Sequence, residues 1–233
     1  PGQRVMAFSS SGSYTQIALA DERLVFALPE QVDTATAASG VTLFTAYGLL
    51  KWAARMAEGE HIVIHAAAGG VGTAAIQLAR NFGAGTIIGV VGNEAKVNTV
   101  LAAGADHVYV RGNGDFREAV NVWTKGKGAD IVLDSVAGSM AEQSLDTLAL
   151  FGRLIHFGQA SGLPAHTTFN RLQVPNHAVI GFSLSAIRRY RPEILSSAAE
   201  ELIPLMTQGK LKVVVDEWFP LSRVTDAHRR MEE

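Results

Sequence analysis

A glycine-rich stretch at residues 65–72 has the composition and position of a turn that binds phosphate groups. It reads His-Ala-Ala-Ala-Gly-Gly-Val-Gly, follows the apolar run at 62–64 and precedes a helical pattern. Ala67, Gly69 and Gly72 fit the three small positions of a dinucleotide fingerprint. The first position allows a tight turn, the second lets the backbone touch a pyrophosphate, and the third lets the helix pack against the strand.

The helix that follows these glycines adds a second feature that suits phosphate. The amides of Gly70, Val71 and Gly72 belong to its first turn, where the helix dipole favours negative charge. No Lys-Ser or Lys-Thr pair follows, which excludes a nucleoside triphosphate P-loop. Glycine also serves tight turns for structural reasons alone. Because strand, glycines and helix fall in the required order, we interpret the stretch as a dinucleotide site.

The residues after the second predicted strand bear on which dinucleotide is bound. An NAD site usually carries an acidic residue there for the ribose hydroxyls, but Gly92 and Asn93 occupy that place. Lys96 follows one helical turn later and can reach a 2′-phosphate, and Arg111 supplies a second cation. Glu94 remains a possible ribose ligand, and solvated surface charge is the alternative for both cations. We predict NADP(H).

The sequence around the glycines alternates between short apolar strands and helices. This rhythm predicts an α/β fold with a doubly wound parallel (Rossmann) sheet covered by helices on both faces. Predicted strands lie at 61–66, 86–91, 107–110, 130–133 and 153–157, and predicted helices lie at 73–82, 94–103, 115–123 and 140–148.

The two ends of the chain have a different pattern. Short strands and turns, including one strand at 14–19, fill the first forty residues, and a strand at 211–215 is predicted near the other end. A helix with Leu195, Ala199, Leu202 and Met206 on one face contains Pro204, which should kink or split it. We expect the two ends to share a second, smaller domain.

Composition excludes several classes of function. The 233 residues carry a formal net charge of -2, which offers no basic field for nucleic acid or an anionic membrane. No apolar run approaches the roughly 20 residues needed to span a bilayer. Cysteine is absent, so disulfides and cysteine-containing zinc sites are excluded, and we predict a cytoplasmic protein. His61 and His65 share one strand face, but without further ligands we predict sheet packing and no metal site.

Five further motifs occur in an order that one family shares. They are Gly-Gln-Arg-Val at 2–5, Leu-Phe-Thr-Ala-Tyr at 43–47, Gly-Ala-Asp-His-Val at 104–108, Asp-Ser-Val-Ala-Gly at 134–138 and Phe-Gly-Gln-Ala-Ser-Gly at 157–162. With the glycine stretch they resemble the medium-chain dehydrogenase/reductases of the zinc-free quinone oxidoreductase (zeta-crystallin-like) branch. The resemblance covers essentially the whole chain.

The resemblance implies a function and a set of cofactor contacts. Such proteins transfer a hydride from NADPH to a quinone or an α,β-unsaturated carbonyl, a small electrophilic acceptor, without zinc. Many relatives carry Tyr at the position of Arg111, and many form homodimers, for which an edge strand near 179–181 is the expected seam. The implied cofactor contacts are Thr45, Gly70, Val71, Asn93, Lys96 and Arg111, with Val136, Phe157, Gly158, Phe182 and Leu184 near the nicotinamide.

The same resemblance predicts three parts of the chain. Residues 1–40 correspond to the remnant of a GroES-like β domain, 41–184 to the Rossmann domain, and 185–233 to a segment that returns to the catalytic domain. Family members usually begin with a complete GroES-like domain, so we interpret the chain as a fragment.

Two alternatives remain open, and no catalytic residue is assigned. Enoyl reductase domains of fatty acid and polyketide synthases share the nucleotide signature, but they commonly carry Lys and Asp as proton donors near the nicotinamide. Met140 and Ser161 stand at those places, which argues against a synthase-type enoyl reductase because neither can protonate an enolate as a Lys or an acid can. The other alternative is a module that binds the dinucleotide without turnover.

Overall fold

The computed structural model describes residues 1–9 and 11–232, and the chain forms two compact units. The larger unit is Thr42–Ser185, and the smaller one combines Pro1–Val41 with Ala186–Glu233. That the smaller unit is the remnant of a GroES-like domain stays a prediction.

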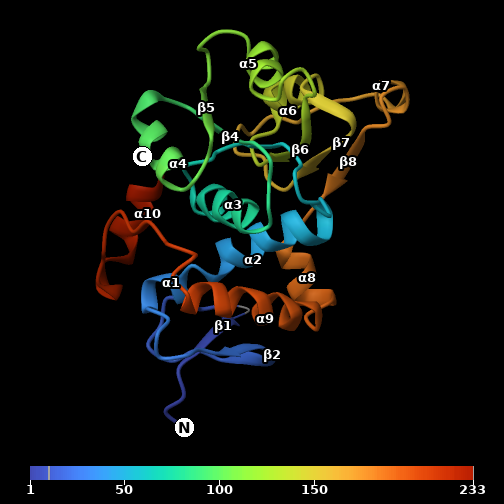
Figure 1. Ribbon diagram of the computed structural model, residues 1–233. Coiled ribbons are helices and arrows are strands. Elements are labelled where there is room, and N and C mark those ends of the chain that lie inside the picture. The colour runs from blue at the N-terminus through green and yellow to red at the C-terminus, as the bar shows by residue number, and fades with distance from the viewer. Residues whose placement is uncertain (10, 233) are drawn as a thin grey trace. The chain divides into compact units, whose positions relative to one another are not determined.

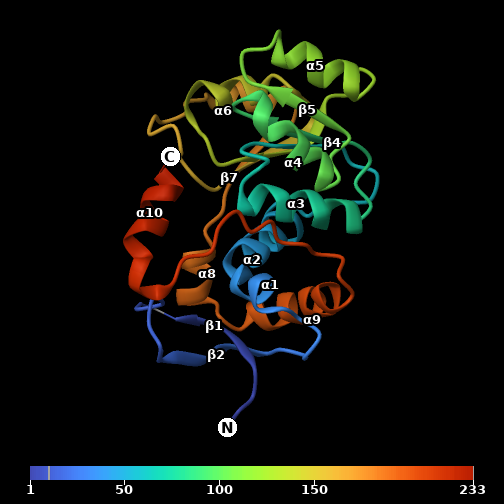
Figure 2. The ribbon, with the colours of Figure 1, turned by 90° about the vertical axis from the view of Figure 1, so that its left-hand side faces the viewer.

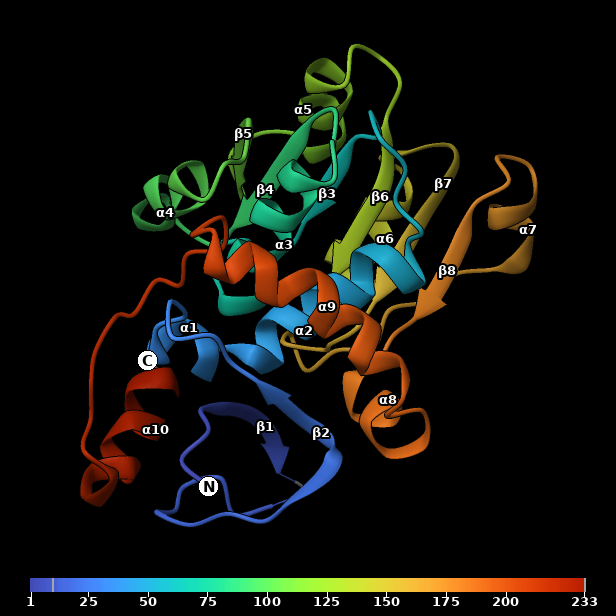
Figure 3. The ribbon, with the colours of Figure 1, turned by 60° about the horizontal axis from the view of Figure 1, so that its bottom comes forward.

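A six-stranded, wholly parallel sheet forms the centre of the larger unit (Figure 3). Its strand order is β5-β4-β3-β6-β7-β8, so the direction of winding reverses between β3 and β6. This confirms the predicted doubly wound fold and marks the β3/β6 boundary as the place where such sheets bind ligands. The strands are β3 (Ile62–Ile64), β4 (Ile87–Val91), β5 (His107–Val110), β6 (Ala129–Asp134), β7 (Leu148–His156) and β8 (Ala178–Gly181).

Helices cover both faces of this sheet. In Figure 1, α3 (Gly70–Asn81) lies below the sheet, whereas α5 (Phe116–Trp123) and α6 (Gly138–Leu145) lie above it. Every residue of β3 and β4 is buried, which explains their continuous apolar sequences. The remaining helical elements of this unit are α2 (Gly40–Gly48), the π-helical turn Leu49–Ala53, the 3-10 turn Glu94–Lys96, α4 (Val97–Ala102), α7 (Phe169–Gln173) and α8 (Leu184–Tyr190). The first residues of α2 and the last residues of α8 belong to the smaller unit.

In the smaller unit, two antiparallel strands pair and a long helix packs beside them (Figure 2). The helix α9 buries Leu195, Leu202 and Met206 on one face, as the sequence predicted. The elements of this unit are β1 (Val5–Ser9), β2 (Ala20–Ala27), α1 (Thr34–Ala38), α9 (Ile194–Thr207), the 3-10 turn Leu221–Arg223 and α10 (Val224–Glu232).

Two predicted strands are wrong, and the helix that contains Pro204 is not split. Residues 14–19 form a bent connection, because β1 ends at Ser9, which already pairs with Ala20. Residues 211–215 form no strand, and no strand in the described part of the chain pairs with them. The helix α9 continues through Pro204, and its apolar face stays buried on both sides of the proline. A kink at Pro204 stays a prediction.

The connection from β3 to α3 is tightly packed. The left-handed backbone that turns the chain lies at Ala66 (φ +49°), one residue before the predicted Ala67. At Gly72 an added Cβ would lie 2.5 Å from the Ala66 carbonyl oxygen and 2.6 Å from the Ala67 Cα. The third glycine therefore has the predicted role, because only hydrogen fits between the helix and the end of the strand.

Replacing Gly72 by alanine should therefore destabilise the protein. The clash involves backbone atoms that cannot rotate away, so we expect a loss of about 1–3 kcal/mol. Gly181→Ala is the matched control, because no atom lies within 4 Å of its ideal Cβ, and we expect its change to stay within about 0.5 kcal/mol. Urea unfolding of both variants checks this, and equal midpoints would contradict it.

Candidate functional site

A cleft lies at the carboxyl ends of β3, β4 and β6, at the point where the winding of the sheet reverses. It encloses about 270 Å³. Four of the predicted cofactor residues line it, namely Gly69, Lys96, Arg111 and Val136. The other lining residues are His65, Ala66, Ala68, Val90, Val91, Gly92, Ala160 and Ser161.

The amino end of α3 borders this cleft. Its N-cap is Gly69, which offers no side chain to cap the helix, and its first turn contains no acidic residue. The positive end of the helix dipole is therefore not neutralised by the helix's own side chains. Gly70 also packs closely, since an added Cβ there would lie 2.9 Å from the Thr42 methyl group. These features suit an anion that hydrogen-bonds to backbone amides.

Two cations stand at the β4 and β5 side of the cleft. The side chains of Lys96 and Arg111 are exposed, and neither has an ion pair within the described residues. The Arg111 guanidinium lies over Gly92, where an added Cβ would come within 2.9 Å of its Nη2 atom. Glu94, the possible ribose ligand, accepts a hydrogen bond from the Asn113 side-chain amide at 2.9 Å. One oxygen of the acid is thus engaged, while the two cations have no ion pair within the described residues.

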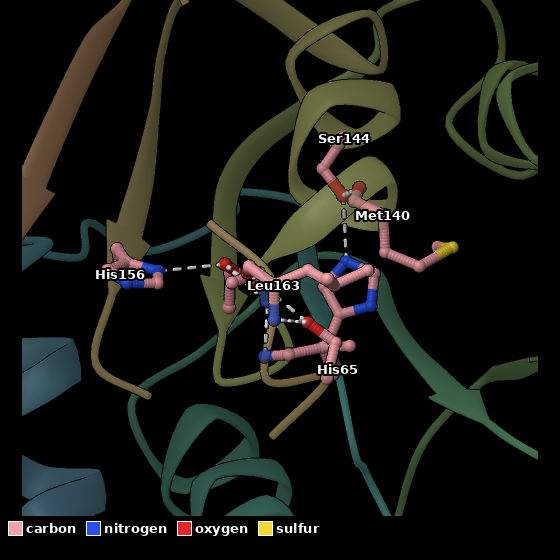
Figure 4. A network of polar contacts seen from close by, with 9 residues as sticks. His65, Met140, Ser144, His156 and Leu163 are labelled. Atoms are coloured by element: carbon pink, nitrogen blue, oxygen red, sulfur yellow. Dashed lines mark hydrogen bonds and ion pairs between the residues drawn. The ribbon is translucent and has the colours of Figure 1, made fainter. Parts of the chain in front are cut away.

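A buried carboxylate holds the opposite wall of the cleft. Asp134, at the end of β6, is fully buried and accepts hydrogen bonds from the amides of Val136 (3.0 Å) and Ala137 (3.1 Å). His156 Nδ1 lies 2.9 Å from its other oxygen (Figure 4). Asp134 thereby fixes the turn that presents Val136 to the cleft.

His65 was predicted to pack in the sheet, and it does so while also lining the cleft. Its ring is buried against Phe116, and its Nε2 atom lies 2.7 Å from the Ser144 hydroxyl oxygen. Burial lowers its pKa to about 4, against a smaller opposing effect of Asp134 and with a still smaller contribution from Arg111. Its position at the carboxyl end of the strand before the glycine turn was the signal that it could border a ligand.

The remaining predicted residues do not line this cleft. Asn93 precedes the 3-10 turn beside it, and Thr45 lies on α2. Phe157 and Gly158 follow β7, and the amide of Phe157 donates to the Asp134 carbonyl oxygen at 2.9 Å. The ring of Phe182 occupies the space beside Gly48, and Leu184 is buried at the start of α8. Their contact with a nicotinamide stays a prediction.

Within residues 1–9 and 11–232, no group of three or more His, Cys, Asp or Glu side chains is placed to hold a metal ion. No helix in the same residues is both long enough and apolar enough to cross a membrane.

Comparison with known proteins places the chain in a family. The family model of zinc-binding dehydrogenases matches residues 70–201. Human quinone oxidoreductase is 32% identical over 232 residues, which cover 99% of this chain and 69% of that protein. Highly-reducing polyketide synthase 1 of Aureobasidium melanogenum is 36% identical over 220 residues, which cover 91% of this chain but 10% of that protein.

A solved structure agrees with this assignment. Escherichia coli quinone oxidoreductase, complexed with NADPH, superimposes with a TM-score of 0.88 at 33% identity, covering 99% of this chain and 72% of that one. The chain therefore belongs to the zinc-binding dehydrogenase family of the medium-chain dehydrogenase/reductase superfamily, and within it is quinone oxidoreductase-like.

The buried His65 predicts a pH dependence of stability. In the unfolded chain its pKa returns to about 6.5, whereas in the folded protein it is about 4. As the pH falls through this window, the unfolded chain takes up a proton that the folded protein refuses, so stability falls; above pH 6.5 the effect vanishes. The full loss is on the order of 3 kcal/mol.

We expect His65→Gln to remove this component, because its amide can still donate to Ser144 but does not titrate. The difference in melting temperature between pH 7.5 and pH 4.5 should be smaller in the variant than in the wild type. Burial also lowers the pKa of His177, which remains in both proteins and therefore cancels. Parallel losses in the two proteins would contradict the assignment.

Proposed function

We propose that the chain binds NADP(H) in the cleft at the β3/β6 boundary and belongs to a reductase that transfers hydride to a quinone or an α,β-unsaturated carbonyl. The single observation that carries this is the convergence of the uncapped α3 amino end with Lys96 and Arg111 on one cleft. The helix end suits the pyrophosphate, and the two free cations suit the 2′-phosphate that distinguishes NADPH from NADH.

The cofactor supplies the hydride, so the protein's contribution is to bind and orient it and to position the acceptor. The amides of Gly70 and Val71 would hold the pyrophosphate. Lys96 and Arg111 would hold the 2′-phosphate, and Val136, fixed by Asp134, would border the nicotinamide half. No zinc enters this proposal.

Preference for NADPH over NADH should depend on the two cations. We expect Lys96→Ala and Arg111→Ala each to weaken NADPH binding roughly tenfold or more, because each loses a charge-assisted hydrogen bond, and to leave NADH binding nearly unchanged. Lys127→Ala is the matched control, since this exposed lysine precedes β6 at the opposite end of the sheet.

Calorimetric titration of all four proteins with both dinucleotides checks this. Equal losses for NADPH and NADH, or a loss in the Lys127 control, would contradict recognition of the 2′-phosphate. Absence of binding to the wild-type chain would contradict the cofactor site itself.

A polyketide-synthase enoyl reductase is the second candidate. It is favoured by the 36% identity to the Aureobasidium polyketide synthase, whereas Met140 and Ser161 stand where such domains commonly carry Lys and Asp. In the structure Met140 packs against the apolar core and the Ser161 hydroxyl accepts from the Leu163 amide at 3.1 Å. Neither side chain offers an acid to the cleft.

Parallel assays of NADPH oxidation with 1,4-naphthoquinone and with a crotonoyl-pantetheine thioester separate the candidates. Turnover with the quinone supports the first proposal, and turnover with the thioester alone supports the second. Binding of NADPH without turnover of either acceptor supports a non-catalytic dinucleotide module.

A further inference from the structure

The two ring nitrogens of His65 have different surroundings, which fixes where its proton lies. The Ser144 hydroxyl donates its single hydrogen to the Met140 carbonyl oxygen at 2.7 Å. It can therefore only accept from His65 Nε2, which lies 2.7 Å away (Figure 4). The neutral ring must carry its proton on Nε2, and Nδ1 is left with an unshared electron pair.

This Nδ1 atom is buried without a partner. His65 is 1% exposed, and among the residues that the structure describes no donor lies within hydrogen-bond distance of Nδ1. Nearly all buried polar atoms in folded proteins are hydrogen-bonded, so an exception calls for a ligand or a water. Two other buried side-chain nitrogens among the described residues lack a partner, namely His61 Nδ1 and Arg188 Nε. Both belong to residues that do not line the cleft.

The position of the ring indicates what kind of partner is missing. His65 lines the cleft, between the cations on the β4 side and Val136 on the β6 side. A pyrophosphate carries only acceptor oxygens at neutral pH and cannot satisfy a second acceptor. The donors that a dinucleotide offers between its phosphates and its two bases are the ribose hydroxyls.

We propose that His65 Nδ1 accepts a hydrogen bond from a ribose hydroxyl of bound NADP(H), so that His65 is a cofactor-positioning residue. This inference rests on the proposed cofactor site. The hydroxyl is that of the adenosine ribose or of the nicotinamide ribose, and the two share the same chemistry at this acceptor.

The electrostatics of the cleft keep this acceptor in working form. Burial lowers the pKa of His65 to about 4, while the smaller effects of the two nearby charges oppose each other, since Asp134 raises the pKa and Arg111 lowers it. The ring therefore stays neutral at physiological pH, and its electron pair remains available. Burial is thus the main reason that the ring remains an acceptor.

Nitrogen-15 NMR of the full chain labelled at histidine tests the proposal directly. We expect the His65 Nδ1 resonance of the free protein to be that of an unprotonated, unbonded nitrogen, and to move upfield on saturation with NADPH while Nε2 stays protonated. Titration with adenosine 2′,5′-bisphosphate and with reduced nicotinamide mononucleotide identifies the ribose, since one of them should reproduce the shift.

Two outcomes would overturn the proposal and leave the cofactor site intact. One is an Nδ1 resonance that does not move although calorimetry shows NADPH bound, which leaves the cofactor site intact and removes only the role of His65. The other is an Nδ1 that is already hydrogen-bonded in the free protein and unchanged by NADPH, which assigns the acceptor to a buried water. Absence of NADPH binding by calorimetry would overturn the proposed cofactor site and this inference with it.

A pair of variants tests the same contact through affinity. His65→Asn places an amide near the position of Nδ1, where its oxygen can accept, but loses the bond to Ser144. His65→Gln reaches Ser144 but has no acceptor at the Nδ1 position. We expect the Gln variant to bind NADPH roughly tenfold more weakly and the Asn variant to stay closer to wild type. Equal affinities in the two variants, or the reverse order, would contradict the assigned acceptor.

Discussion

The close contact between the amino end of α3 and the end of β3 is the constraint on which the rest of the site depends. With only hydrogen at Gly72, the helix can begin directly at the end of β3, because an added Cβ there would lie 2.6 Å from the Ala67 Cα. This places the first-turn amides where β4, β5 and β6 also end. Residues from four strands can then border one cleft, although 71 positions separate His65 from Val136 in sequence.

Positive groups line the cleft, and the two nearby carboxylates accept hydrogen bonds from other residues. The helix end, Lys96 and Arg111 contribute positive potential, and Glu94 is bound by Asn113. Asp134, the buried acid nearest the cleft, is compensated by two backbone amides and His156. Such an arrangement favours an anion without requiring a large net charge, in agreement with the formal charge of -2 for the whole chain.

The features that the sequence predicted correctly depend on residues close together in the chain. The parallel sheet, the turn before α3 and the helix α5 follow from local spacing and composition. The strands expected at 14–19 and 211–215 failed because alternation does not reveal whether a partner strand is present. The role of His65 was missed because its partner Ser144 lies 79 residues away, and only the fold brings α6 to the end of β3.

Backbone strain marks both walls of the cleft. Ala66 and Ala137, which turn the chain after β3 and after β6, have φ values of +49° and +63°, and residues with a Cβ pay roughly 1–3 kcal/mol in such conformations. Glycine at either position would relieve that cost but would also free the turn to explore other shapes. The folded chain therefore holds backbone strain in the two turns that border the cleft. Because these turns are fixed on folding, binding a ligand does not cost the conformational entropy of ordering them.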